Sequence, residues 1–205
     1  EHIEDIVITD GYEGGKAVLE YFRGLLLTLK GTSSEAMSVS VKWDGAPAVV
    51  CGTNPDNGKF FVGTKSVFAQ NAKVNYTKKD IANNHGTDEL GQKLLKCLVH
   101  LKKLNMQGVF QGDLLYTDED IIRKNIGGKP HLTFTPNTIT YAVPEASELG
   151  KQIDRAKVGI IFHTTYVGES LADMNAKGGA DVSSFTKSND VFFDNATYKD
   201  VSGSA

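Results

Sequence analysis

The sequence has few cysteines, no long apolar run and no signal peptide before its first helix. Only Cys51 and Cys97 occur among 205 residues, and neither belongs to a C-x-x-C pair of the kind that binds metal or performs redox chemistry. Both lie in apolar segments, so we expect them to be reduced core thiols. No apolar run approaches the length of a membrane span, and the default expectation is a cytoplasmic protein without a membrane partner.

A strong charge of one sign is also missing. The formal net charge is −3 and the isoelectric point is about 6.0, so any contact with nucleic acid would have to come from a local basic patch. The patterns G-x-x-x-x-G-K-[ST] and G-x-G-x-x-G do not occur, so bound phosphate would have to be held by lysine side chains. With 40% hydrophobic and 23% charged residues, the composition is that of a globular protein with one good core.

The spacing of apolar residues predicts alternating helices and strands. Helices are expected over residues 13–30, 87–104 and 146–156, and strands over 37–41, 48–51, 59–65, 108–116, 131–135, 138–143 and 158–166. The chain is expected to divide into an N-terminal helical segment (1–35) that packs on the domain, a domain (36–178) and a weakly patterned C-terminal segment (179–205) that continues in a longer protein. The lysines of the second helix form either a solvated face or a nucleic-acid patch.

The run Lys42-Trp43-Asp44-Gly45 lies at a turn between two apolar strands. A lysine becomes a nucleophile only when its protonated form is disfavoured, for instance by desolvation in a cleft. Lys42 follows an apolar strand and precedes Trp43, a position that suits such a lysine. Asp44 lies two residues on, where it can pair with Lys42 or bind a ligand hydroxyl. The alternative is a strand-end lysine beside a turn-forming Asp-Gly, because short motifs often occur by chance.

Two later residues extend this candidate site. Lys65 ends a strand, where a second cation would lower the proton affinity of Lys42 or meet a phosphate; an exposed strand-end lysine is the alternative. Asp113 follows Gly112 in an apolar strand, and a carboxylate there needs a partner, either a metal ion or a structural hydrogen bond. Gly112 indicates close approach of a ligand or of another backbone. His163 has no second His or Cys at ligand spacing, so we interpret it as a structural or substrate-facing group.

Four runs, taken in order, resemble the motifs of the covalent nucleotidyltransferases: Lys42-Trp43-Asp44-Gly45, Thr64-Lys65-Ser66, Phe110-Gln111-Gly112-Asp113, and the stretch 160–171. This superfamily comprises the ATP-dependent DNA and RNA ligases and the mRNA-capping guanylyltransferases. The resemblance covers about residues 36–175 and implies an α+β, ATP-grasp-like nucleotidyltransferase domain, with a mainly antiparallel sheet and flanking helices.

The resemblance also implies roles for individual residues. Lys42 would attack the α-phosphate of ATP, or of GTP, to form a lysyl-nucleotide, with Mg²⁺ as the metal and a polynucleotide as the final acceptor. Lys65 would be the basic residue and Asp113 the acidic one. The implied catalytic residues are Lys42 and Asp44, the implied nucleotide-binding residues are Gly45, Lys65, Phe110, Phe162 and Tyr166, and the implied metal ligand is Asp113.

The sequence departs from the family in lacking an E-G-[LIV]-[LIV]-x-K strand and a later K-x-K strand, which hold the metal and the triphosphate. These strands would lie beyond Ala205, or the chain is a divergent relative that binds nucleotides without transferring them. It also resembles proteins of tailed-phage genomes with K-W-D-G-[AS]-P and Q-G-D-L-L-[FY] runs, which implies a phage-infected host cell as its setting. Besides the ligase-type enzyme, two hypotheses stay open: a non-catalytic nucleotide- or nucleic-acid-binding module, and a phage structural protein in which K-W-D-G is only a turn.

Overall fold

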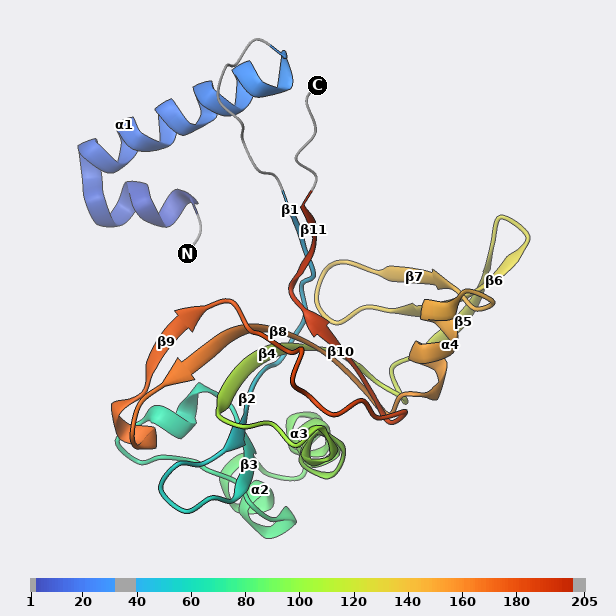
Figure 1. Ribbon diagram of the computed structural model, residues 1–205. Coiled ribbons are helices and arrows are strands. Elements are labelled where there is room, and N and C mark those ends of the chain that lie inside the picture. Colours follow the sequence, from blue (N-terminus) through green and yellow to red (C-terminus); the bar gives the residue numbers. More distant parts are fainter. Residues whose placement is uncertain (1–2, 32–39, 201–205) are drawn as a thin grey trace. The chain divides into compact units, whose positions relative to one another are not determined.

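The computed structural model describes residues 3–31 and 40–200, without the side chains of 40–42 and 197–200, and has an α+β fold rich in antiparallel strands (Figure 1). The helices, with η for a 3-10 helix, are α1 (Ile3–Leu29), η1 (Lys65–Phe68), α2 (Lys78–His85), α3 (Glu89–Leu101), η2 (Lys102–Leu104), α4 (Glu148–Arg155) and η3 (Leu171–Asp173). The strands are β1 (Ser40–Lys42), β2 (Ala48–Thr53), β3 (Phe60–Gly63), β4 (Val109–Thr117), β5 (Ile122–Ile126), β6 (Lys129–Phe134), β7 (Tyr141–Pro144), β8 (Val158–Val167), β9 (Asn175–Gly178), β10 (Val191–Asn195) and β11 (Thr197–Asp200). Within these ranges no helix has both the length and the apolar content needed to cross a bilayer.

The chain forms two compact units, one from Lys42–Ala196 and one from the two flanking segments, Glu1–Val41 and Thr197–Ala205. The flanking unit contains α1, in which Gly11 has a positive φ of 56° and interrupts the helical path. The larger unit begins later than the expected range 36–178. It also ends later, because β10 belongs to its main sheet.

The main sheet has the strand order β10-β8-β4-β2-β3, with β9 added beside β8. The pair β10–β8 is parallel and the other pairs are antiparallel. The strands β3, β2 and β4 form an antiparallel meander. The strand that we expected before the Lys42 turn does not join this sheet in the described part of the chain, because β1 pairs with β11. Residues 37–39 of that expected strand lie outside the described residues.

The helix α3 covers one face of the main sheet and forms the largest apolar core. Asp88 caps its first turn by accepting a hydrogen bond from the Gly91 amide, and Leu94, Cys97 and Leu101 are fully buried on one side of the helix. Cys51 of β2 is buried in the same core, as expected from the sequence. Burial raises the pKa of the Cys97 thiol to about 12, so both cysteines are packing residues.

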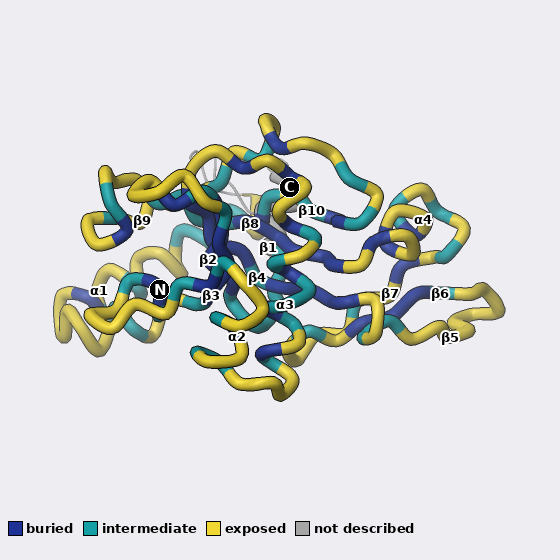
Figure 2. The backbone as a smooth tube through the Cα atoms, turned by 90° about the horizontal axis from the view of Figure 1, so that it is seen from below, coloured by how far each residue is buried: buried dark blue, intermediate teal, exposed yellow. Residues whose placement is uncertain are grey.

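The opposite face of the main sheet is covered by two smaller apolar clusters. The first contains Val50, Val109 and Leu171 and lies beneath η1 and η3. The second lies beneath α4 and a three-stranded sheet of order β5-β6-β7, and includes Leu115 and Ile161. Figure 2 shows the central strands of the main sheet as largely buried and the tip of the β5–β6 hairpin as exposed.

The segment after residue 178, which we expected to be weakly patterned, contributes to the core. Phe185 is 5% exposed and packs its ring against Phe110, with 4.9 Å between ring centroids. β10 extends the main sheet by pairing with β8. The sequence signal was short, because only Val191, Phe192 and Phe193 form an apolar run there.

The close packing of Gly112 between neighbouring strands can be tested by adding one methyl group. A Cβ at Gly112 would lie 2.6 Å from the Ile161 carbonyl oxygen, so backbone and not a ligand makes the close approach expected from the sequence. We expect Gly112→Ala to lower the free energy of unfolding by about 1–3 kcal/mol, because the strands must separate. Gly178→Ala is the control, since nothing lies within 4 Å of its Cβ position. Equal urea midpoints for the two variants would contradict this packing.

Candidate functional site

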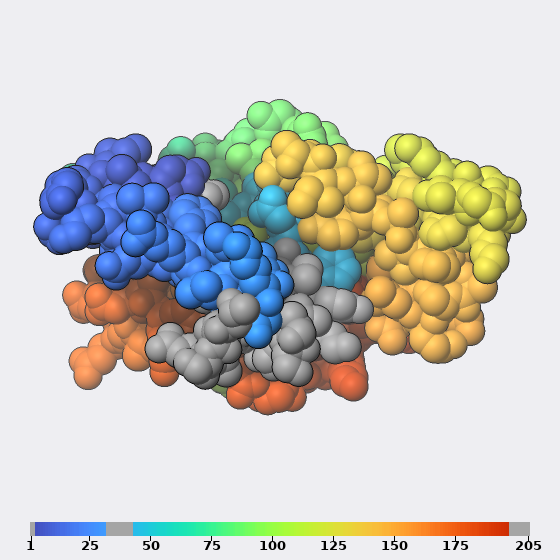
Figure 3. All heavy atoms as spheres, turned by 90° about the horizontal axis from the view of Figure 1, so that it is seen from above, coloured from blue at the N-terminus to red at the C-terminus, as the bar shows by residue number. Residues whose placement is uncertain are grey.

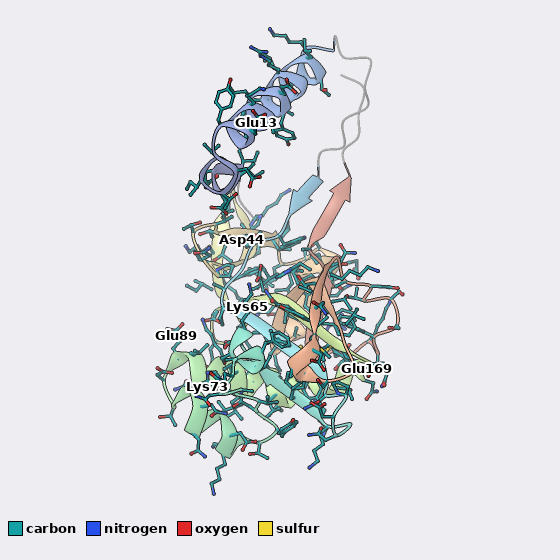
Figure 4. The ribbon with its side chains drawn as sticks, turned by 90° about the vertical axis from the view of Figure 1, so that its left-hand side faces the viewer. Glu13, Asp44, Lys65, Lys73, Glu89 and Glu169 are labelled. Carbon is teal, nitrogen blue, oxygen red and sulfur yellow. The ribbon has the colours of Figure 1, made fainter. Side chains whose placement is uncertain are left out.

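The strand register brings three of the sequence-predicted positions to one rim of the main sheet. Ala48 pairs with Asp113, and Val50 pairs with Gly63, so Lys65 follows β3 at the same end of the sheet at which β2 begins. The Asp44-Gly45 turn directly precedes that start. Figure 4 labels Asp44 and Lys65 in this part of the larger unit. These residues are distant in sequence, and the antiparallel pairing is what collects them.

The turn at Gly45 lies directly against β4. A Cβ at Gly45 would be 2.5 Å from the Leu114 carbonyl oxygen and 3.2 Å from the Cβ of Asp113, so only glycine fits without displacing the strand. On the other side of the contact, the Leu114 amide donates a hydrogen bond of 3.0 Å to the Pro47 carbonyl oxygen. The turn is thus fixed to the central strand that carries Asp113.

Tyr141 of β7 holds the backbone of Asp44. Its hydroxyl accepts a hydrogen bond from the Asp44 amide at 2.8 Å and donates one to the Asp44 carbonyl oxygen at 3.0 Å. The Tyr141 ring also stacks on Trp43, with 5.0 Å between centroids. The Asn137 amide group donates to Asp44 Oδ2 at 3.3 Å. Trp43 is therefore a packing anchor of the turn, and one carboxylate oxygen of Asp44 already has a protein donor.

Asp113 forms a pair with His163. The distance between Asp113 Oδ1 and His163 Nε2 is 3.2 Å, and the two side chains are only 13% and 19% exposed. His163 is an extra residue in β8, because Gln111 pairs with Thr164 while Gly112 pairs with Phe162. His163 lies on the face that carries Asp113, and the bulge brings Tyr166 to that face as well.

Gln111 and Tyr166 continue the polar row on that face. The Tyr166 hydroxyl donates to Gln111 Oε1 at 2.7 Å, and its ring lies 4.4 Å from the Phe68 ring centroid. Burial raises the pKa of the Tyr166 phenol, which keeps it protonated as a donor. Gln111, Asp113, His163 and Tyr166 thus form a row of hydrogen-bonded polar groups, which we call the polar row.

The structure describes the side chain of Lys65 but only the backbone of Lys42. Lys42 is the last residue of β1 and immediately precedes the Trp43 anchor, but its side chain lies outside the described part of the chain. Lys65 is exposed at the start of η1 instead of ending a strand, because β3 stops at Gly63. No described residue forms an ion pair with Lys65, so its charge is available to an anion.

Phe110 and Phe162 do not belong to the polar row. Both point into the core beneath α3, where their rings lie 6.3 Å apart and their side chains are 6% and 0% exposed. Both rings pack against Phe185, which explains their position in the core. Neither ring has an open face on which a base could stack. Of the aromatic residues predicted to bind nucleotide, only Tyr166 lies on the face that carries Asp113.

The polar row fits a magnesium ion only in part. Asp113 supplies the hard carboxylate oxygen that Mg²⁺ prefers, although His163 shares it. Among the residues that the structure describes, no group of three His, Cys, Asp or Glu side chains is placed to hold a metal. Mg²⁺ commonly binds through one or two carboxylates together with substrate phosphates. The residue set therefore suits an ion that arrives with a nucleotide.

A cavity of about 620 Å³ lies elsewhere in the larger unit, beside α4 and the edge strand β10. Arg155, Lys187 and Phe193 are among its lining residues, and none of the predicted site residues is. The candidate site is thus a set of polar groups along the main sheet that lies outside this cavity.

Sequence reasoning missed Tyr141 and Gln111 and left the role of His163 open. Tyr141 contacts Asp44 across 97 residues, a distance at which no local pattern gives a signal. Gln111 lies two residues before Asp113, so strand alternation could have placed the two on one face. The bulge at His163 had no sequence signal.

The fold and site define an α+β protein with an antiparallel-rich sheet and a polar rim. A search of curated proteins and of solved structures finds no match. The family described as "Family of unknown function (DUF6267)" matches residues 1–205. The chain belongs to this family.

Removing the Tyr141 hydroxyl tests how the Asp44 turn is held. We expect Tyr141→Phe to cost about 1 kcal/mol of stability and to speed hydrogen exchange of the Asp44 amide, because that amide loses its acceptor. Tyr12→Phe, at a tyrosine that is 79% exposed, is the control. Unchanged exchange at Asp44 in Tyr141→Phe would mean that this hydroxyl does not hold the turn.

Proposed function

We propose that this protein is a covalent nucleotidyltransferase of the DNA/RNA ligase type, with an ATP-grasp-like fold, acting in polynucleotide end joining or modification. The observation that carries the proposal is the convergence of Asp44-Gly45, Lys65 and Asp113 on one rim of one sheet. In the resemblance these residues come from three separate motifs that act on one nucleotide. An antiparallel sheet brings them together here across about seventy residues of sequence.

In the proposed reaction, the unprotonated Lys42 amine attacks the α-phosphorus of ATP. A P–N bond forms, the bond between the α-phosphorus and the bridging oxygen breaks, and pyrophosphate leaves with the electron pair while the amine proton passes to solvent. The turn, held by Tyr141 and by Gly45, fixes the backbone from which Lys42 extends, and such positioning is worth several kcal/mol of barrier.

The remaining residues of the rim act on charge and orientation. Lys65 offsets phosphate charge from the exposed start of η1. Asp113 binds a ribose hydroxyl or, with the phosphates, Mg²⁺, which supplies further charge neutralisation. Tyr166 contributes a hydroxyl at the far end of the polar row.

A second candidate function is a nucleotide-binding module without transfer. It is favoured by the Asp113–His163 pair, which gives the carboxylate a partner without any ligand, and by the burial of Phe110 and Phe162 away from the rim. Both candidates predict nucleotide binding at the rim, and only the first predicts a covalent product.

Mass spectrometry after incubation with α-labelled ATP or GTP and Mg²⁺ or Mn²⁺ distinguishes the two candidates. We expect wild-type protein to gain one nucleoside monophosphate on Lys42, and Lys42→Ala to gain none, because no other amine occupies the end of β1. Lys59→Ala, at an exposed lysine before β3, should react as wild type does. An adduct that persists in Lys42→Ala would remove the assignment of the nucleophile.

The proposed role of Asp113 predicts a separation of binding from stability. We expect Asp113→Asn to weaken nucleotide binding about tenfold or more, because the site loses a charged acceptor, with a smaller effect on the free energy of unfolding. Asp194→Asn, at an exposed carboxylate of β10, is the control. Calorimetric titration and urea unfolding measure the two quantities. Loss of stability without loss of binding would make Asp113 a structural partner of His163.

A further inference from the structure

The three-stranded sheet of β5, β6 and β7 carries no acidic residue. Between Asp120 and Glu145 the sequence contains Arg123, Lys124 and Lys129 but neither Asp nor Glu. The whole chain has a net charge of −3, so this sheet is a local basic region in an acidic protein. Such a region attracts polyanions even when the global charge does not.

The two faces of the β5–β6 hairpin use their charges differently. On the inner face, Arg123 pairs with Glu145 at 3.3 Å and with Asp154 of α4, and its cross-strand partner Leu132 is fully buried. The opposite face, which we call the outer face, presents the other side chains of the ladder. Its members are Ile122, Lys124, Ile126, Lys129, His131 and Thr133, and of these Thr133 is buried.

The outer face combines free cations with exposed apolar side chains. Lys124 is the cross-strand partner of His131, and Lys129 that of Ile126. No described residue forms an ion pair with Lys124 or Lys129. Ile122 and Ile126 are 58% and 44% exposed. Figure 3 shows this hairpin, in yellow, at the border of the larger unit, with its outer part open to solvent.

Three lysines of α3 and η2 are neutralised by nearby carboxylates. On α3, Lys93 pairs with Glu89 at 2.8 Å and Lys96 with Asp118 at 2.5 Å, and on η2 Lys103 pairs with Asp190. This pairing makes α3 a poor polyanion site and favours the interpretation of its lysines as a solvated face. The outer face differs because its unpaired lysines lie in a sheet that carries no acidic residue.

The same small sheet also supports the Asp44 turn of the candidate site. Tyr141 of β7 binds the Asp44 backbone, and Asn137, between β6 and β7, binds the Asp44 side chain. A ligand on the outer face would therefore rest on the element that positions the Lys42 turn.

We propose that the outer face of the β5–β6 hairpin binds the backbone of single-stranded nucleic acid. Lys124 and Lys129 contact phosphates, and Ile122 and Ile126 pack against sugars and unstacked bases, which a duplex keeps in its stack. The choice of a polynucleotide as partner rests on the proposed function. The choice of the outer face as the binding surface rests on its charge and exposure alone.

Fluorescence anisotropy with a short labelled single-stranded oligonucleotide, without nucleotide, tests the proposal. We expect Lys124→Gln/Lys129→Gln to raise Kd on the order of tenfold at 0.1 M salt and to reduce the slope of log K against log salt by about 1.4. Lys78→Gln/Lys79→Gln removes the same charge from two exposed lysines of α2 and should leave both quantities nearly unchanged. The substitution Lys124→Arg/Lys129→Arg should retain binding.

Several outcomes would overturn the proposal. These are no binding by wild type at low salt, equal losses in both glutamine variants, binding of duplex alone, or lysine-dependent binding only to vesicles of anionic phospholipid. Adduct formation on Lys42 needs no polynucleotide, and this titration needs no nucleotide. A negative titration with a positive adduct therefore rejects the outer face alone, and the reverse result rejects the transferase alone.

Discussion

The arrangement of the candidate site depends on one close contact, the approach of Gly45 to the Leu114 carbonyl of β4. Because β4 lies between β2 and β8, the turn is fixed to a strand that has neighbours on both sides. The contact also sets where β2 begins, and thereby the register that places Asp113 beside the turn. A side chain at Gly45 would push β4 away, and β4 carries Asp113. It would thereby also disturb β8, which pairs with β4 and carries the histidine partner of Asp113, His163.

Strong apolar patterns predicted most of this fold, whereas short apolar runs and strands exposed on both faces were missed. The strands β2, β4 and β8 and the helix α3 have long apolar runs or clear helical spacing, and their cores are where the sequence placed them. β5 is exposed on every residue, so it has no buried side from which an alternating pattern could arise. For the site, the local motif around Asp44 was predictable, whereas its partner Tyr141 comes from a strand that only the tertiary fold brings near.

The aromatic assignments show where pattern reasoning fails physically. Phe110 and Asp113 are three residues apart, and the alternation of a strand already places such residues on opposite faces. Phe162 and Tyr166 are four apart, so alternation alone would place both on one face. The bulge at His163 reverses this, sending Phe162 into the core and Tyr166 to the polar row. An inserted residue of this kind becomes visible only when the pairing with β4 is known.

The distribution of charge connects the rim to the outer hairpin. Carboxylates on the β4–β5 connection and at Asp190 neutralise lysines of α3 and η2, whereas Lys65 at the rim and Lys124 and Lys129 on the outer face are among the described lysines without an ion pair. An acidic protein with these unpaired lysines would repel a polyanion over most of its surface and attract it at a few places. One of these places, the outer face, lies on the small sheet whose strand β7 carries Tyr141, and Tyr141 holds the Asp44 turn. The hairpin that attracts a polyanion is thus packed together with the strand that positions the candidate nucleophile's turn.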